Sequence, residues 1–152
     1  MPLTIRAATL ADAPVVIEFN RLLAQESEGK KLNLSLLAPG VAAGLTDSHK
    51  CRYFVAEEDG KVLGQLGVTY EWSDWRNGWL WWIQSVYVRP EARRRGVFRA
   101  LFKHVEQTAR NDPEVIGLRL YVERENHIAQ QTYERLGMAE TGYFVLEKYP
   151  LE

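Results

Sequence analysis

Apolar side chains are most concentrated in residues 79–88, a run without formal charge that is rich in aromatic and β-branched residues. A strand with one exposed face would alternate polar and apolar positions, so this run predicts a central strand buried on both faces. Pro90 ends the run, and Gly96 follows three arginines. From Val97 onward apolar residues recur at helical spacing, which predicts a strand, a cationic glycine turn and a helix.

The pattern before this run predicts two helices after a short first strand at residues 4–8. Thr9, Asp12 and Pro14 are typical of a helix start. A second, weaker helix is expected at about residues 35–45, and Pro39 and Gly40 predict that it is irregular.

Further strands are predicted on both sides of the central run. Residues 52–57 and 62–72 form two of them, joined at Asp59-Gly60, which is a hairpin signal. Another turn at residues 73–78 leads into the central strand. After the Val97 helix we expect a parallel strand at 118–122, a helix at 127–136 capped by Gly137, and a last strand at 143–148.

Chain length, net charge, cysteine content and hydropathy limit the kinds of protein that this sequence is expected to form. A chain of 152 residues fits one domain, 1–152, and the formal net charge of −1 favours neither nucleic acid nor an anionic membrane as partner. Cys51 is the single cysteine, opens an apolar strand, and is interpreted as structural. No apolar run approaches membrane-spanning length and residues 1–9 lack a signal-peptide pattern, so we expect a cytoplasmic protein.

The turn before the Val97 helix has the chemistry of a phosphate site. A helix N-terminus presents unpaired N–H groups and a partial positive charge, and glycine allows close approach of the main chain. Arg93, Arg94 and Arg95 add charge that attracts a diphosphate. A basic loop can also be an ordinary solvated surface, but the order strand, turn, helix favours the phosphate interpretation.

The run Arg93-Arg94-Arg95-Gly96-Val97-Phe98 resembles the [QR]-x-x-G-x-[GA] acetyl-CoA loop of the Gcn5-related N-acetyltransferases. Phe98 departs from the pattern, because a small residue usually stands there. A second run, from Asn126 to Met138, is similar to that family's N-x-x-A-x-x-x-Y-x-x-x-G-[FM] helix at every marked position. The two motifs span Trp79 to Met138.

This resemblance implies an α/β fold with a central mixed sheet, splayed parallel strands and helices on both faces. It also implies acetyl transfer from acetyl-CoA, without a metal, to a primary amine by direct attack in a ternary complex. The acceptor can be a small molecule or a protein amine. The family is often dimeric, so a homodimer is also expected. The alternative is a non-catalytic module that binds acyl-CoA as a sensor or regulator.

The resemblance also suggests which residues meet the donor. Main-chain groups of Val86 and Val88 would line the pantetheine arm, and the diphosphate would lie on the loop that holds Arg93, Arg94, Arg95, Gly96, Val97, Phe98 and Arg99. Tyr133 is the candidate general acid, because a phenol with a pKa near ~10 is protonated at neutral pH; a core tyrosine is the alternative. Asn126 either caps its helix or contacts the pantetheine arm.

The general base is less clearly marked. Many members of the family carry a carboxylate on the central strand, where this chain has Gln84 and Ser85. Glu71 and Asp74 are the nearest acids by topology, with Glu57 a third choice. Either of the first two would accept a proton through water or attract a cationic amine. Both can equally be surface charges beside a turn.

The five tryptophans lie in one short stretch around the predicted hairpin. Trp79 and Trp81 share one face of a strand and Trp82 lies on the other. Cross-strand packing in the core or at a dimer interface is the favoured explanation, and a cage for an ammonium group is the alternative. The histidines show no metal-ligand spacing; they are His49, His104 and His127.

Overall fold

The two longest strands form a hairpin at the middle of the computed structural model, which describes residues 2–152. They are β3 (Lys61–Ser73) and β4 (Gly78–Val88), paired antiparallel. Polar or small residues in β3 alternate with apolar ones, so the strand presents a polar face and an apolar face. The hairpin therefore separates two chemically different sides of the sheet.

Three shorter strands complete a five-stranded mixed sheet in the order β1-β2-β3-β4-β5. β1 (Thr4–Ala7), β2 (Arg52–Glu58) and β3 pair antiparallel in succession, and β4 pairs parallel with β5 (Val115–Arg119). The predicted hairpin turn is confirmed, with positive φ at Asp59 and Gly60. The mixed sheet with one parallel pair confirms the predicted fold class.

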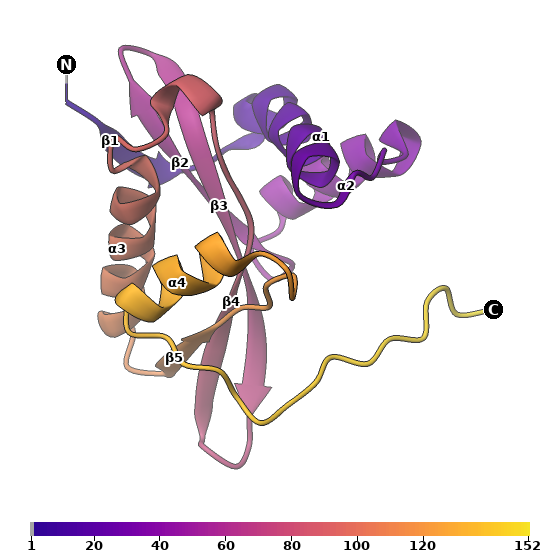
Figure 1. Cartoon of the computed structure of the whole chain (residues 1–152), viewed down its shortest axis with the longest axis vertical. Helices are drawn as coiled ribbons and strands as arrows, with labels where there is room; N and C mark the ends of the chain where they lie inside the picture. Colours follow the sequence, from indigo (N-terminus) through magenta and orange to yellow (C-terminus); the bar gives the residue numbers. More distant parts are fainter. Residues whose placement is uncertain (1) are drawn as a thin grey trace. The chain divides into compact units, whose positions relative to one another are not determined.

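Helices cover both faces of this sheet (Figure 1). A short 3-10 turn, η1 (Leu10–Asp12), leads into α1 (Ala13–Glu28), and α2 (Leu34–Thr46) follows. These two helices lie on one face of the sheet, and α3 (Val97–Arg110), the helix that the apolar spacing predicted, lies on the other. α2 continues through Pro39, so the proline that was predicted to make this helix irregular does not end it. Within residues 2–152, no helix has the length and hydropathy needed to cross a membrane.

The start of α1 is fixed by a partly buried ion pair. Asp12 accepts hydrogen bonds from both terminal nitrogens of Arg6, each at 2.9 Å, and from the Thr9 N–H at 2.7 Å. Arg6 also donates to Glu57 on β2 at 3.0 Å. These bonds join β1, β2 and the beginning of α1, because one guanidinium binds carboxylates from two elements.

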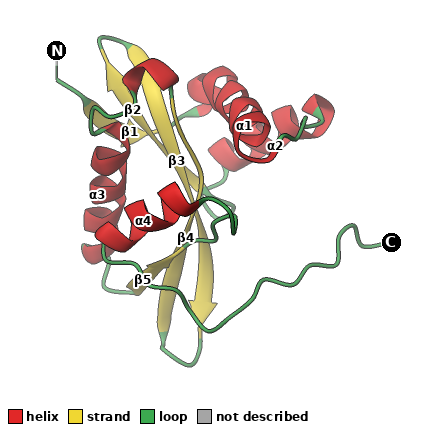
Figure 2. Ribbon diagram, viewed as in Figure 1, coloured by secondary structure: helices red, strands yellow, loops and turns green. Residues whose placement is uncertain are grey.

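The chain divides into two compact units, one ending at Leu120 and one covering Tyr121–Glu152. The second contains α4 (His127–Arg135), which begins after Asn126 and ends before Gly137 at a φ of 92°, as predicted. Residues 143–148 form no strand, and Figure 2 draws the chain after α4 as loop. That prediction was wrong because strand propensity is realised only beside a pairing partner.

The fifth strand is also shifted from its predicted place, from residues 118–122 to Val115–Arg119. Its pairing with β4 runs from Trp79↔Val115 to Trp82↔Arg119 and then stops, although β4 continues to Val88. The parallel strands therefore separate, as the predicted splayed arrangement requires.

Candidate functional site

The point at which β4 and β5 separate coincides with an irregularity in β4. Gln65 pairs with Tyr87 while Gly67 pairs with Gln84, so one extra residue of β4 faces β3. Ser85 has a φ of 55°, a conformation that is uncommon outside glycine. A β-bulge of this kind bends the strand and ends regular pairing.

Two buried amide side chains support the bulge from the side of α1. Gln65 Nε2 donates to the Ser85 carbonyl at 2.9 Å and to Asn20 Oδ1 at 3.1 Å. Gln65 is fully buried and Asn20 is 8% exposed. Because a buried polar group needs a partner, this contact fixes the bulge in one geometry.

Beyond the bulge, main-chain groups of β4 point into the gap left by β5. The Arg89 N–H donates to the Leu63 carbonyl at 2.8 Å, so the groups of Val88 point away from β3. Because the main-chain groups of successive strand residues alternate in direction, those of Val86 point the same way as those of Val88. The Val88 carbonyl accepts from Arg93 Nε at 2.9 Å. The N–H groups of Val86 and Val88 therefore line the open edge, where sequence analysis predicted a pantetheine site.

The turn between β4 and α3 presents backbone amides. After a 3-10 turn, η2 (Pro90–Ala92), Arg94 and Gly96 both adopt left-handed conformations, with φ of 64° and 80°. Gly96 is the N-cap of α3 and supplies no capping side chain. The N–H groups of the first turn of α3 thus have no intrahelical acceptor, and the positive end of the helix dipole adds to the field there.

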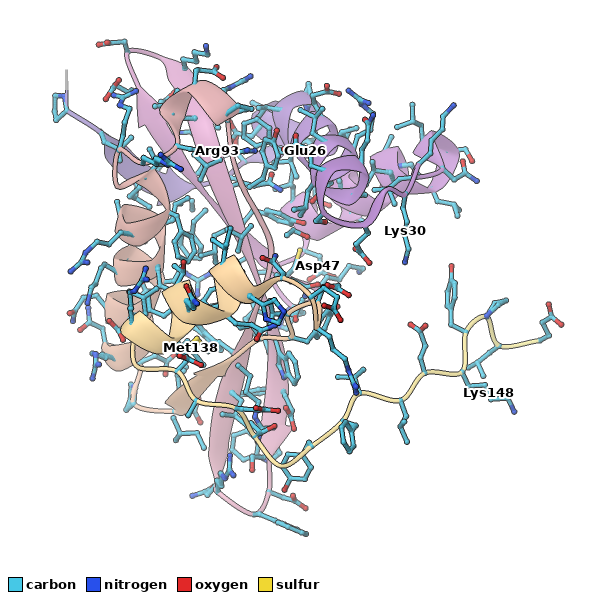
Figure 3. All side chains as sticks on the ribbon, in the orientation of Figure 1. Glu26, Lys30, Asp47, Arg93, Met138 and Lys148 are labelled. Carbon is cyan, nitrogen blue, oxygen red and sulfur yellow. The ribbon has the colours of Figure 1, made fainter. Side chains whose placement is uncertain are left out.

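The three loop arginines differ in their partners. Arg93 Nη2 donates to Glu26 Oε1 at 2.8 Å, and Figure 3 shows the two side chains meeting between the loop and α1. Arg95 Nη2 donates to both carboxylate oxygens of Glu58, at 2.9 and 3.1 Å. Two of the three predicted phosphate-binding arginines are therefore held by carboxylates.

Arg94 and Arg99 are the available cations of this region. Within the described range, residues 2–152, neither side chain forms a hydrogen bond or an ion pair, and both side chains are exposed. Phe98, which departs from the family pattern, packs against Phe102 one turn further along α3, with ring centroids 6.0 Å apart. The Phe98 ring therefore has a packing partner on its own helix.

Tyr87 extends the network around Arg93. Its hydroxyl donates to Glu26 Oε2 at 2.6 Å, and the Arg93 guanidinium lies 5.5 Å from its ring centroid. The Arg93 hydrogen bond, followed by that of Tyr87, lowers the pKa of Glu26. Burial, followed by the hydrogen bond to Glu26, raises the pKa of Tyr87 to about 12. Glu26 is therefore an anion at neutral pH and fixes both neighbours.

Sequence analysis missed a row of polar groups on the sheet face toward α1. Gln84 Nε2 donates to Thr69 Oγ1 at 2.6 Å, next to the bulge. Tyr53 lies in the same row, with its hydroxyl 3.4 Å from Asn20 Nδ2. β3 has polar or small residues at positions 65, 67, 69 and 71. This alternation in the sequence could have predicted the row. It forms a polar surface beside the opening between β4 and β5.

Glu71 is the last residue of this row, and its carboxylate is held by two hydrogen bonds. It accepts from Trp82 Nε1 at 2.8 Å and from Arg119 Nη1 at 3.0 Å, so β3, β4 and β5 all contribute. The hydrogen bond from Trp82, then that from Arg119, lowers the pKa of Glu71. A carboxylate with a lowered pKa is a weak base but a persistent negative charge.

Asp74 lies elsewhere, at the tip of the β3–β4 hairpin. Its Oδ1 accepts from the Trp75 N–H at 2.9 Å, which is a turn-stabilising contact. Gly67 pairs with Gln84 at the bulge, and a strand rise of about 3.3 Å per residue from Gly67 places Asp74 about 23 Å further along the hairpin. Asp74 therefore lies far from the bulge at Ser85.

The tryptophans pack mainly across the hairpin. Trp79 lies edge-on to Trp72, and Trp79 and Trp81 both lie edge-on to Tyr70, at centroid distances of 5.1, 6.5 and 6.2 Å. Trp82 points to the opposite face, as predicted. A hollow of about 490 Å³ is lined in part by Trp79 and Trp81, but the Arg52 guanidinium already lies 5.3 Å from the Trp81 ring centroid. Cross-strand packing, not an ammonium cage, is thus what the aromatic contacts support.

The second unit carries the two remaining predicted residues. Asn126 caps α4, because its Oδ1 accepts from the Ala129 N–H at 3.2 Å. Tyr133 lies on the second turn of α4, and burial raises the pKa of its hydroxyl. Its phenol is consequently protonated at neutral pH. Among residues 2–152, no three histidine, cysteine or acidic side chains are grouped so that they hold a metal ion.

Comparison with known proteins gives one matching family. The sequence model of the Acetyltransferase (GNAT) family matches residues 21–138, more than half of the chain. A possible acetyltransferase from Clostridium difficile 630 is 44% identical, with 100% of each chain covered and a TM-score of 0.93. No match to a curated protein was found.

More distant solved structures share the fold. A predicted acetyltransferase from Clostridium acetobutylicum, solved with acetyl-CoA, is 14% identical over 97% of this chain and 96% of that one, with a TM-score of 0.79. A ribosomal-protein-alanine N-acetyltransferase from Brucella melitensis biovar Abortus 2308 is 17% identical over 98% and 100%, also with a TM-score of 0.79. At these identities the likeness concerns the fold alone.

Proposed function

Since the chain belongs to the Acetyltransferase (GNAT) family, we propose that it binds acetyl-CoA and transfers the acetyl group directly to a primary amine in a ternary complex. The observation that carries this proposal is the opening between β4 and β5, which leads to the amide-lined turn before α3. The acetyl-CoA in the Clostridium acetobutylicum structure supports the choice of donor. Both compact units together form the catalytic domain in this proposal.

Donor binding is assigned to main-chain groups and to two cations. The N–H groups of Val86 and Val88 hold the pantetheine arm as an extra strand would be held, since they point into the gap. The amides from Gly96 to Arg99 hold the diphosphate, and Arg94 and Arg99 supply charge. Arg93 and Arg95 have a different role: their bonds to Glu26 and Glu58 maintain the shape of the loop.

Acetyl transfer requires a balanced movement of two protons. The acceptor ammonium first loses a proton to water. The neutral nitrogen then attacks the thioester carbonyl, the new C–N bond forms, and the C–S bond breaks. Tyr133 donates its hydroxyl proton to the departing thiolate, the surplus proton of the new amide passes to water, and the phenolate is reprotonated from water.

Glu71 is assigned an electrostatic role toward the acceptor. Its pKa is lowered, so it is ionised at neutral pH and attracts a cationic amine to the polar row beside the bulge. Asp74 has no place in the reaction as proposed, because it lies at the hairpin tip. A ribosomal-protein amine, which the Brucella enzyme's name specifies, is one acceptor class to test, beside polyamines, amino acids and aminoglycosides.

The test is a panel of these primary amines with acetyl-CoA, followed by release of free thiol, with a calorimetric titration of acetyl-CoA alone. Turnover on one amine class is the expected result. Tight binding of acetyl-CoA without turnover on any amine would favour the acyl-CoA sensor and overturn the enzyme. Failure to bind acetyl-CoA would overturn the assignment of the loop. A cytoplasmic location stays a prediction, which fractionation of cells would check.

A further inference from the structure

Gln65, on β3, is a polar side chain that the interior of the protein buries completely. Its Nε2 donates to the Ser85 carbonyl at 2.9 Å and to Asn20 Oδ1 at 3.1 Å, so both hydrogens of the amide nitrogen are used. Because a main-chain carbonyl can only accept, the nitrogen and not the oxygen of this amide must face Ser85. The two bonds therefore fix the orientation of the Gln65 amide.

This arrangement is unfavourable for stability in two respects. Within residues 2–152, no group donates a hydrogen bond to Gln65 Oε1, although that atom is buried. A buried acceptor without a partner lowers stability, and an apolar side chain of similar size would avoid that loss. The left-handed conformation of Ser85, with a φ of 55°, is the second unfavourable feature. Two such features in contact indicate a functional site, where a local geometry is maintained against stability.

The bond to Ser85 determines where the next N–H points. The Ser85 carbonyl and the Val86 N–H belong to one peptide unit, which is planar and trans, so the two groups point in opposite directions. Gln65 holds the carbonyl on the side of β3, and the Val86 N–H is therefore directed into the gap between β4 and β5. Neither Ser85 nor Val86 is paired with β3, so without this bond the peptide unit can rotate about the dihedrals beside it.

Val86 is the residue of the open edge that lies nearest to the bulge. In the proposed function the diphosphate lies on the turn before α3, and β4 reaches that turn through Val88. A pantetheine arm that runs from this turn along β4 passes Val88 first and brings its acetyl end to Val86. Gln84, in the polar row, comes immediately before the bulge, so we expect the acceptor amine on the same side.

We propose that Gln65 is a positioning residue for acetyl transfer: by holding the Ser85 carbonyl, it directs the Val86 N–H toward the thioester oxygen. This inference rests on the proposed function. Negative charge develops on that oxygen as the amine attacks, so an N–H held toward it stabilises the transition state more than the bound donor. Because it is fully buried, Gln65 touches neither substrate. Its loss should lower kcat far more than it changes the affinity for acetyl-CoA.

The first experiment is steady-state kinetics with acetyl-CoA and the amine that the wild type acetylates. Gln65→Met keeps the size of the side chain but removes the donor. We expect a kcat about 100-fold lower, the range for a reacting group misplaced by about 1 Å, and a Kd for acetyl-CoA within about threefold of the wild type. Asn20→Leu removes only the second partner of the Gln65 amide, so kcat should fall about tenfold or less. The double variant should be no slower than Gln65→Met, because both changes act through one bond.

Val105→Ala is the matched control. Val105 is fully buried on α3, which covers the face of the sheet opposite to α1. The variant therefore loses core packing but keeps every hydrogen bond of the bulge. Circular dichroism and urea unfolding show whether each variant is folded and how far it is destabilised. The positioning role predicts a wild-type kcat for Val105→Ala, whereas a general loss of stability would affect Val105→Ala and Gln65→Met alike.

A second measurement does not require turnover. With isotope-labelled valine, the amide resonances of Val86 and Val88 are followed by NMR during titration with acetyl-CoA, and Val86→Ile and Val88→Ile identify them. In the wild type both resonances should move, because each N–H gains an acceptor. In Gln65→Met the Val88 resonance should still move, since the pantetheine arm still binds there, whereas the Val86 resonance should not.

Three results would overturn this inference and leave the proposed function standing. The first is a folded Gln65→Met variant that keeps the wild-type kcat, and the second is a variant whose Kd rises as much as its kcat falls. The third is a Val86 resonance that moves equally in the variant and the wild type. A wild type that binds no acetyl-CoA, or binds it without turnover on any amine, would instead overturn the proposed function, and this inference with it.

Discussion

Arg93 Nη2 and Glu26 Oε1 lie 2.8 Å apart and join the loop before α3 to the end of α1. Glu26 also accepts the hydroxyl of Tyr87, so one carboxylate fixes a residue of β4 and a residue of the loop. The arginine that the family motif marks for the donor is thus committed to the protein itself. In the proposed function, the charge offered to a diphosphate comes instead from Arg94 and Arg99.

This division of the arginines predicts different effects of two matched substitutions. Arg94→Ala removes an available cation, and we expect the Kd for acetyl-CoA to rise about tenfold, as for the loss of one charge-assisted hydrogen bond. Arg95→Ala breaks a half-exposed pair with Glu58, which is worth about 0–1 kcal/mol, so the Kd should rise less than about fivefold. Calorimetric titration measures both, and equal losses would contradict the division.

Tyr133 is predicted to act on the rate and not on donor affinity. Tyr133→Phe should lower kcat about 100-fold or more, the range for loss of a general acid, and leave the Kd for acetyl-CoA unchanged. Burial raises the pKa of Tyr133, so its hydroxyl keeps its proton up to and beyond the ordinary value of about 10. The wild-type kcat should accordingly show no fall between neutral pH and that value. A parallel loss of rate and affinity in the variant would indicate a packing role.

The charge of a predicted acid can be removed at two different places, at Glu71 beside the polar row and at Asp74 in the hairpin tip. Glu71→Gln removes the charge but keeps an oxygen for Trp82, and we expect the KM of a cationic acceptor to rise about tenfold with little change in kcat. Asp74→Asn should alter neither constant. Steady-state kinetics with a cationic and a neutral amine checks this, since only the cationic acceptor should be affected. A fall in kcat of about 100-fold for Glu71→Gln would instead identify it as the base.

Asp12 is predicted to make folding dependent on pH. The hydrogen bonds from Arg6 lower the pKa of Asp12 in the folded state. The contribution of Asp12 to the free energy of unfolding is therefore full at pH values above its pKa in the unfolded chain, about 3.9. This contribution is lost as the pH falls through the lower pKa of the folded state. Asp12→Asn should reduce the free energy of unfolding at pH 7 by about 2 kcal/mol, as expected for a buried group bonded to a charge.

The control for Asp12 is the exposed pair of Glu18 and Arg21, which lie one helical turn apart. Glu18→Gln should change the free energy of unfolding by at most about 0.5 kcal/mol. Urea unfolding at pH 7 and pH 3 compares the two variants with the wild type. If the wild type and Asp12→Asn still differ by the same amount at pH 3, the pH dependence does not come from Asp12.

Local patterns in the sequence were sufficient to predict most elements. The α3 helix begins at Val97 as predicted, because the apolar spacing and Gly96 lie next to each other in the chain. The hairpin at Asp59-Gly60 is local in the same way. Residues 143–148 misled the prediction, because a strand also needs a pairing partner and a local pattern of residues does not reveal one.

The carboxylate partners of the loop arginines could not be predicted from local patterns in the sequence. Arg93 and Glu26 are 67 residues apart, and Arg95 and Glu58 are 37 residues apart. Nothing near the triplet distinguishes a paired arginine from an available one, because the distinction depends on how α1 and β2 pack. The bulge at Ser85 was equally invisible, since serine has no preference for a positive φ.

The extra residue at Ser85 also exchanges odd and even positions along β4. Before it, the even-numbered Trp82 and Gln84 share the face of α1, whereas after it the odd-numbered Tyr87 does so. Deleting one residue here would keep the composition of the strand nearly intact but turn Tyr87 away from Glu26. The length of this segment is therefore constrained more tightly than the identity of its side chains, and insertions or deletions should be tolerated less well than substitutions.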